Sequence, residues 1–548
     1  MVKQRPDWSV LAAEARERFG ITQFRPGQRE LIEAVLGGTD ALGILPTGAG
    51  KSLCYQLPAL FLPGVVVVVS PLIALMKDQH EHLERAEVAA ARLDSTLSEG
   101  EQRAQEREVV AGAHNIVLLT PERLREPAHL EPLRKRGVAL FVVDEAHCVS
   151  QWGHDFRPAY LELRNAIEAL GRPTVLALTA TAPADRVDDI LETLGIPAAR
   201  VIQGGLEREN LFLEVKRTVN EQEKRTELTR ILQAQPGAGI IYAATIRTVS
   251  KVHEWLTAQG FDAVRYHGQL RTAERESAQE RFMSGEVRLI VATNAFGLGV
   301  DKPDVRFIVH WNFPDSIESY YQEAGRAGRD GDPARCSLFY RLEDKRVRSF
   351  FLGGKQPRKD DVTRFLRALA QQEHAVSLSD LASASGLSER RATVICAGLE
   401  SLHLVERNGR LRRAKRALKD AELTAFLDRF TDRYEADHGR LRAIMSYGES
   451  TLCRMKFIRE YFGEPPGESC GHCDNCKLPV TQAVRIPRTP RRRRVEVEPN
   501  FGVDQIVTHR RFGSGKILES RGDELTIDFV RHGTRRVLAS YVSLVRPG

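Results

Sequence analysis

Short apolar runs alternate with longer segments of helical spacing between about residues 30 and 345. A strand buried on both faces of a parallel sheet is a nearly continuous apolar run, and the intervening helices cover the two faces of the sheet. The pattern therefore predicts an α/β fold with parallel strands. The expected strands are Ala41–Leu45, Val65–Ser70, Ile116–Thr120, Leu140–Val143, Val175–Leu178, Gly239–Tyr242, Leu289–Thr293 and Phe307–His310.

The strand series restarts after residue 212, which predicts two similar lobes in tandem, 1–208 and 209–350. The chain has 548 residues, whereas single hydrophobic cores stop growing at about 250–300 residues. Several domains are therefore expected, with a ligand cleft between the two lobes.

A different pattern follows residue 355. Leucines at helical spacing, a turn at Gly386 and the hairpin signal Asn408-Gly409 predict a winged helix-turn-helix. The expected modules after the lobes are a winged helix at 356–418, a cysteine-bearing helical module at 419–479, a basic Pro/Arg-rich linker at 480–499 and a small β-barrel at 500–548.

Composition is that of folded soluble domains, with 42% hydrophobic and 28% charged residues. The apolar run Val65–Val69 is far shorter than the roughly 20 residues of a membrane helix. The N-terminus lacks the apolar core of a signal peptide, so a reducing bacterial cytoplasm is expected. The net charge of +7 does not by itself indicate a polyanion partner, and the basic run Arg491–Arg494 fits either a phosphate contact or a solvated linker.

A phosphate-binding loop follows the first predicted strand. Glycines in such a loop let backbone N–H groups surround phosphates, and Leu45 stands where the strict pattern has glycine. Lys51 is expected to reach the β and γ phosphates of ATP, and Ser52 to hold Mg²⁺. The predicted nucleotide-binding residues of the loop are Thr47, Gly48, Ala49, Gly50, Lys51 and Ser52.

Two adjacent carboxylates, Asp144 and Glu145, follow the buried strand that ends at Val143. Asp144 is expected to bind Mg²⁺, and Glu145 to activate the water that attacks the γ-phosphate. In the second lobe, Arg326 and Arg329 are candidates for an arginine finger that crosses the cleft. Taken alone, the loop pattern could be accidental, the two acids could be solvated surface residues, and the arginines could be surface salt-bridge partners. Their combination predicts ATP hydrolysis.

These elements, in this order, resemble the superfamily 2 helicases, and further blocks resemble the RecQ family of DNA helicases, whose lobes are RecA-like. Arg25 and Gln28 lie in a segment similar to the family's nucleotide-sensing motif. Ile21 stands where relatives often have an aromatic residue, and no role is assigned to Arg247 because its position is shifted by one. The other matching blocks are Ser70–Gln79, Thr120–Leu124, Leu178–Ala182, Ala292–Gly299, Asp301–Pro303 and Gln322–Arg329.

The segment Cys148–Pro158 resembles the family's aromatic-rich loop, which couples DNA to ATP hydrolysis. Aromatic side chains stack on unpaired bases and an arginine meets a phosphate. Because the loop directly follows the carboxylate pair, DNA binding there can reposition the Mg²⁺ site. The DNA-binding residues that the resemblance implies are Ser150, Trp152, His154, Phe156 and Arg157.

Four cysteines have the spacing of a tetrahedral zinc site: Cys453, Cys470, Cys473 and Cys476. His472 is the alternative fourth ligand, but its place between two ligands disfavours it. RecQ proteins commonly place the zinc module before the winged helix, whereas the order is inverted in this sequence. The inversion leaves open whether the hairpin at Asn408-Gly409 separates strands.

The segment Phe501–Val545 resembles the Tudor-like C-terminal module of UvrD/PcrA-type helicases, which implies a partner such as RNA polymerase or a repair protein. A plain DNA-binding barrel is the alternative. Taken together, the resemblances imply an ATP-dependent 3′–5′ DNA helicase of recombination, repair or replication that binds single-stranded and duplex DNA. The rival functions are a duplex-DNA translocase tethered to a partner, an RNA helicase and an ATP-switched adaptor.

Overall fold

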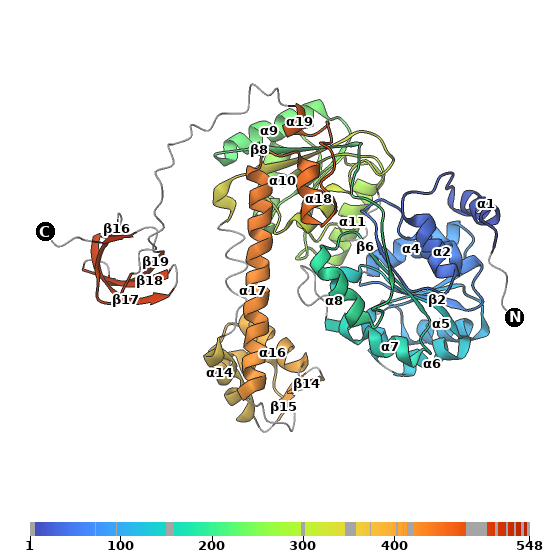
Figure 1. The fold of residues 1–548 in the computed structure, drawn as a ribbon, viewed down its shortest axis with the longest axis horizontal. Helices are drawn as coiled ribbons and strands as arrows, with labels where there is room; N and C mark the ends of the chain where they lie inside the picture. Colours follow the sequence, from blue (N-terminus) through green and yellow to red (C-terminus); the bar gives the residue numbers. More distant parts are fainter. Residues whose placement is uncertain are drawn as a thin grey trace. The chain divides into compact units, whose positions relative to one another are not determined.

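The computed structural model describes residues 6–71, 73–94, 96–125, 127–149, 158–297, 302–345, 358–372, 374–401, 404–408, 410–413, 420–477, 501–509, 513–521, 524–530, 533–538 and 542–544 (Figure 1). The chain divides into two compact units, Met1–Pro479 and Val480–Gly548. Within the described residues, no helix combines the length and the apolarity needed to cross a membrane.

The first lobe contains a seven-stranded parallel sheet of order β3-β4-β2-β5-β6-β1-β7. Its strands are β1 (Ala41–Ile44), β2 (Val65–Val69), β3 (Ala90–Leu93), β4 (Ile116–Leu119), β5 (Val138–Val143), β6 (Thr174–Thr179) and β7 (Arg200–Gln203). Its helices are α1 (Trp8–Phe19), α2 (Gln28–Leu36), α3 (Leu53–Gln56), α4 (Ile73–Arg85), α5 (Glu99–Ala111), α6 (Pro127–Arg136), α7 (Leu163–Ala169) and α8 (Ala184–Leu194), with 3₁₀ turns at Pro58–Leu60, Pro121–Arg125, Ala146–Val149 and Pro158–Glu162.

The central strand β2 shows why this lobe forms a two-sided sheet. All five of its valines are buried. Alternate side chains point to opposite faces, so Val65, Val67 and Val69 enter one core and Val66 and Val68 the other. A strand of this kind is stable only when helices cover both faces.

The second lobe repeats this architecture with a six-stranded parallel sheet of order β10-β11-β9-β12-β13-β8. Its strands are β8 (Leu211–Arg217), β9 (Ala238–Tyr242), β10 (Ala263–Tyr266), β11 (Leu289–Ala292), β12 (Val305–His310) and β13 (Ala334–Tyr340). Its helices are α9 (Glu221–Ala234), α10 (Ile246–Ala258), α11 (Thr272–Met283) and α12 (Ile317–Ala324), with a 3₁₀ turn at Leu342–Asp344.

A small helical module with a β-hairpin follows the second lobe. Gly386 ends its second helix with φ of +66°, a backbone conformation that glycine adopts without steric cost. The module has its own core, to which Phe365, Leu381 and Ile395 contribute. Its elements are α14 (Lys359–Ala370), α15 (Leu378–Ser385), α16 (Glu389–Ser401), β14 (Val405–Asn408) and β15 (Arg410–Arg413).

The long helix α17 (Asp420–Glu449) connects this module with the second lobe (Figure 1). Phe426, near its start, packs in the core of this module, whereas Ile444 and Tyr447, near its end, pack in the core of the second lobe. Two short helices follow, α18 (Arg454–Tyr461) and α19 (Asp474–Lys477). The cysteine-bearing module therefore shares a hydrophobic core with the second lobe, although the small helical module separates the two in the sequence.

The C-terminal unit is a five-stranded antiparallel sheet of order β19-β18-β17-β16-β20. Val507, Ile517, Leu525, Ile527 and Phe529 form its core. Its strands are β16 (Ile506–His509), β17 (Gly513–Arg521), β18 (Glu524–Phe529), β19 (Gly533–Leu538) and β20 (Val542–Leu544). The predicted fold class, with two parallel-sheet lobes followed by helical modules and a small β module, is confirmed.

Candidate active site and zinc centre

The phosphate-binding loop lies between β1 and α3, at the carboxyl edge of the first sheet. Gly48 and Gly50 have φ of +82° and +73°, backbone angles that residues with a side chain rarely adopt. Lys51 folds back over the loop, and its Nζ donates to the carbonyl of Leu45 at 3.4 Å. The loop therefore has the glycine conformations that a phosphate-binding loop needs, and Lys51 lies beside it.

Gln28 holds the loop from the side of α2. Its Nε2 donates to the carbonyls of Ala49 (3.0 Å) and Gly50 (2.9 Å), and its Oε1 accepts from the backbone N–H of Arg25 (2.8 Å). Gln28 is buried, and a Cβ on Gly50 would lie 2.7 Å from its Nε2. The structure thus brings Arg25 and Gln28 to the predicted nucleotide site.

Asp144 and Glu145 follow β5, at the same edge of the sheet as the phosphate-binding loop. Both side chains are buried, and the N–H of Glu145 donates to Asp144 Oδ1 at 3.0 Å. Burial and then the charge of Glu145 raise the pKa of Asp144 to about 7, and the charge of Lys51 opposes the shift. Two adjacent buried carboxylates, with the Ser70 hydroxyl beside Asp144, form an oxygen-rich donor set of the kind that Mg²⁺ prefers.

His147 is a site residue to which the sequence assigned no role. Its Nδ1 lies 3.0 Å from Thr179 Oγ1 and 3.3 Å from Glu145 Oε2, and Thr179 Oγ1 donates to the carbonyl of Thr181. The ring therefore links the end of β5 with the end of β6. The sequence Asp-Glu-Ala-His could have indicated this role of His147, because a histidine two residues after Glu145 can turn back toward the carboxylate.

The residues expected to bind DNA, Ser150, Trp152, His154, Phe156 and Arg157, lie outside the described residues. The ends of their segment are described. It leaves the 3₁₀ turn that carries His147, and it returns at Tyr160, whose hydroxyl donates to the carbonyl of Asp144 at 3.0 Å. Both ends of the segment are thus fixed to the carboxylate site.

The arginine block of the second lobe follows α12 and meets the loop of the first lobe. A Cβ on Gly325 would lie 3.0 Å from Thr47 Cβ, and a Cβ on Gly48 would lie 3.2 Å from Arg329 Cγ. Arg326 is only 5% exposed, and its Nη2 would lie 3.1 Å from a Cβ on Gly297. The structure therefore brings Gly325 and Arg329 to the phosphate-binding loop across the lobes, whereas Arg326 lies against Gly297 of its own lobe.

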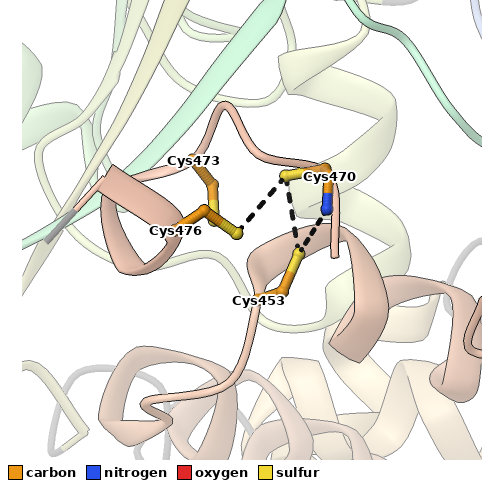
Figure 2. A group of neighbouring side chains, drawn as sticks. All are labelled: Cys453, Cys470, Cys473 and Cys476. Atoms are coloured by element: carbon orange, nitrogen blue, oxygen red, sulfur yellow. Dashed lines mark hydrogen bonds between the residues drawn. The ribbon is translucent and has the colours of Figure 1, made fainter. Parts of the chain in front are cut away.

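Cys453, Cys470, Cys473 and Cys476 converge, with their sulfur atoms all within 4.8 Å of one another (Figure 2). Backbone N–H groups of Cys470 and Arg454 donate to the sulfurs of Cys453 (3.2 Å) and Cys473 (3.4 Å). Although burial opposes it, backbone N–H donors lower the pKa of Cys453 to about 7. Burial instead raises the pKa of Cys470 and Cys476. Four convergent thiols, two of which accept backbone N–H donors, fit a tetrahedral zinc ion.

His472 does not join this group, and its Nδ1 lies 2.6 Å from the carbonyl of Cys470. The remaining cysteines, Cys54, Cys148, Cys336 and Cys396, are buried outside the cluster. They behave as the ordinary small side chains that the sequence indicated.

Two parallel-sheet lobes with a phosphate-binding loop on one and arginines on the other define the class of helicase motor ATPases. The sequence matches the DEAD/DEAH box helicase family over residues 25–190, the helicase conserved C-terminal domain over 223–331 and the RecQ zinc-binding domain over 413–477. The chain belongs to the RecQ family of ATP-dependent DNA helicases. ATP, Mg²⁺ and Zn²⁺ are its cofactors.

Three curated relatives support this assignment. The ATP-dependent DNA helicase RecQ of Bacillus subtilis is 35% identical over 84% of this chain and 65% of its own length. The probable ATP-dependent DNA helicase RecS of the same organism is 35% identical over 77% of this chain and 89% of its own length. RecQ of Pasteurella multocida is 33% identical over 93% of this chain and 69% of its own length.

Solved structures support the fold. Helicase Lhr of Mycobacterium smegmatis, bound to single-stranded DNA and AMP-PNP, has a TM-score of 0.51 at 19% identity and covers 80% of this chain and 62% of its own. The helicase MrfA, bound to DNA, has a TM-score of 0.51 at 19% identity and covers 77% of this chain and 64% of its own.

Proposed function

We propose that this chain is an ATP-dependent DNA helicase that unwinds duplex DNA in the 3′ to 5′ direction during recombination, repair or replication. One observation carries the proposal: the Gly325–Arg329 block of the second lobe lies against the phosphate-binding loop of the first. Hydrolysis at such a junction changes the contact between the lobes, and a change of lobe contact can move bound DNA.

The proposed roles divide by position. Lys51 binds the β and γ phosphates, Ser52 and Asp144 hold Mg²⁺, and Glu145 activates water. The backbone of Thr47–Gly50 surrounds the phosphates, and Arg326 and Arg329 stabilise the charge that develops on the γ-phosphate. Arg25 and Gln28 bind the nucleotide base, and Ser150, Trp152, His154, Phe156 and Arg157 bind single-stranded DNA.

The proposed domain division gives each segment one task. The lobes 1–208 and 209–350 form the motor, 356–418 is a winged helix for duplex DNA, and 419–479 is the zinc module. The basic segment 480–499 links them to the Tudor-like module 500–548, which recruits RNA polymerase or a repair protein. Such a protein acts in the bacterial cytoplasm, on the nucleoid.

Direction and activity are tested together by strand displacement on duplexes with a 3′ or a 5′ single-stranded tail. Wild-type protein is expected to unwind the 3′-tailed substrate with ATP and Mg²⁺, and Lys51→Ala is expected to unwind neither. Lys135→Ala, an exposed lysine of α6, is the matched control. Activity on neither tail from folded, zinc-loaded wild type contradicts the proposal.

The same experiment separates the helicase from a duplex-DNA translocase, which hydrolyses ATP without displacing a strand. The comparisons do not favour that alternative, because the matched relatives are named DNA helicases.

A further inference from the structure

Arg208 lies in the segment between β7 of the first lobe and β8 of the second. Its guanidinium contacts both halves of the ATP site. Nη1 donates to the carbonyls of Thr47 (3.2 Å) and Gly325 (3.4 Å), and Nη2 donates to those of Ala327 (3.2 Å) and Gly328 (2.6 Å). One side chain therefore joins the phosphate-binding loop to the arginine block.

Every N–H donor of the Arg208 guanidinium has an acceptor. A guanidinium has five N–H donors. Nε donates to Asn210 Oδ1 at 3.2 Å, so five oxygen acceptors surround the group. With no donor left for a phosphate oxygen, Arg208 acts on the backbone around the nucleotide and not on the nucleotide itself.

The positive charge of Arg208 is largely removed from water, which disfavours the charged form. Burial lowers its pKa. Among the described residues, no carboxylate forms an ion pair with it, and its five hydrogen-bond acceptors are carbonyl oxygens, four of the backbone and one of the Asn210 side chain. A desolvated charge that faces backbone carbonyls gives a fixed geometry, because the planar fork bonds only oxygens in set directions.

Neighbouring contacts hold the segment that carries Arg208. Asn210 Nδ2 donates to the carbonyls of Gly328 (2.7 Å) and Asp332 (2.9 Å). The hydroxyl of Tyr321 donates to the carbonyl of Leu206, and Arg459 of α18 pairs with Glu207. The segment is thus fixed by α12 on one side and by the zinc-bearing module on the other.

We propose that Arg208 is a positioning residue for ATP hydrolysis: it sets the register between the phosphate-binding loop and the block that carries Arg326 and Arg329. The inference rests on the proposed ATP-driven function of this site. Since both bridged elements supply backbone carbonyls to one rigid group, loss of Arg208 lets the arginines drift from the γ-phosphate while the loop still binds nucleotide.

Steady-state ATPase assays at saturating single-stranded DNA test the proposal with Arg208→Ala. Misplacement of catalytic groups by about 1 Å costs up to about 100-fold in rate. We expect kcat to fall about 10- to 100-fold, with the KM for ATP and the affinity for DNA each within about threefold of wild type. Arg208→Lys keeps the charge but has three donors, and it is expected to recover only a few-fold of the lost kcat.

Arg288→Ala is the matched control. Arg288 also donates from the second lobe to three backbone carbonyls, those of Gln235, Gly237 and Leu232, but away from the ATP site. Its loss should lower the melting temperature about as much as Arg208→Ala and leave kcat unchanged. This comparison separates a positioning role from general stability.

Three results overturn the proposal: a normal kcat in Arg208→Ala, an equal fall in Arg288→Ala, or a loss confined to the KM for ATP. Full recovery in Arg208→Lys also overturns it, because charge alone then suffices. If Arg208→Ala does not fold, Arg208→Lys alone decides between these outcomes. An inactive wild type instead contradicts the proposed function itself.

Discussion

Glu145 has a backbone conformation that few residues of its type adopt. Its φ of +50° lies in the left-handed region, which costs a non-glycine residue about 1–3 kcal/mol. The neighbouring contacts maintain it: the N–H of Asp144 bonds to Val69 of β2, and the N–H of Cys148 bonds to the carbonyl of Glu145 at 2.8 Å. The strain aims the carboxylate at His147 and at the edge of the sheet where the phosphate-binding loop lies.

Replacement of Glu145 by glutamine tests its proposed role as the base. The amide keeps the shape but cannot take a proton from water, so kcat for ATP is expected to fall about 100- to 10,000-fold. Nucleotide affinity should stay within about threefold, because Lys51 and the loop backbone remain. Steady-state hydrolysis and titration with a fluorescent ATP analogue measure the two quantities.

Glu84→Gln, at an exposed position of α4, is the control and should behave as wild type. If Glu145→Gln hydrolyses ATP at the wild-type rate, another group activates the water.

The strands that the sequence predicted are those with continuous apolar runs. Each of the eight predicted runs contains one strand. In chain order these strands are β1, β2, β4, β5, β6, β9, β11 and β12. The strands at the sheet edges, such as β7, escaped prediction because edge strands face solvent: three of its four residues are exposed. The internal strand β13 was also missed although most of it is buried, because Arg335 and Ser337 interrupt its apolar run. A strand was therefore visible in the sequence where its apolar run was continuous.

The candidate site residues also divide into those that a local sequence pattern reveals and those that it does not. The phosphate-binding loop and the cysteine group have local spacing that chemistry demands, so both could be found in the sequence. Arg208 has no such signal, because its acceptors in the arginine block lie 117 to 120 residues away and the one in the phosphate-binding loop 161 residues away. Only the docking of the lobes reveals what it contacts.

The cysteine group is expected to hold about one zinc ion per chain, since four thiols complete a tetrahedral structural site. Cys470→Ser should lose most of the metal and lower the melting temperature, because the same group packs in the core of the second lobe. Elemental analysis of purified protein measures the stoichiometry. Cys396→Ser, in the core of the small helical module, should keep the metal, and equal zinc in both variants would contradict the assignment.

Arg454 and Asp474 link the zinc module to the second lobe. Its Nε and Nη2 donate to Asp474 at 2.8 and 2.9 Å, and Asp474 also accepts from the N–H of Val215 in β8. Arg454 is buried, and removing one partner of a buried pair costs about 3–5 kcal/mol.

Arg454→Ala is therefore expected to lower the melting temperature strongly. Arg134→Ala, which breaks the exposed pair with Glu131, should cost only about 0–1 kcal/mol. Thermal unfolding of both variants compares them, and equal shifts would show that the buried pair adds nothing.

At the scale of the whole molecule, the zinc module contacts the second lobe although a small helical module separates the two in the sequence. The helix α17 is 30 residues long, or about 45 Å at 1.5 Å per residue. A helix of this length reaches from the core of the small helical module to the core of the second lobe. Ile444, Tyr447, Cys453 and Ile458 then pack with the second lobe in one core.

The last unit, Val480–Gly548, has its own core and forms a compact unit separate from Met1–Pro479. All the described groups proposed to bind ATP, Mg²⁺ and zinc lie before residue 480.

A chain that ends at Pro479 is therefore expected to keep DNA-stimulated ATP turnover within about twofold of the full chain, because few contacts cross a boundary of this kind. ATPase assays of both chains, at matched zinc content, measure the ratio. A tenfold loss would mean that the C-terminal sheet takes part in the motor cycle, and its assignment to partner recruitment would then be wrong.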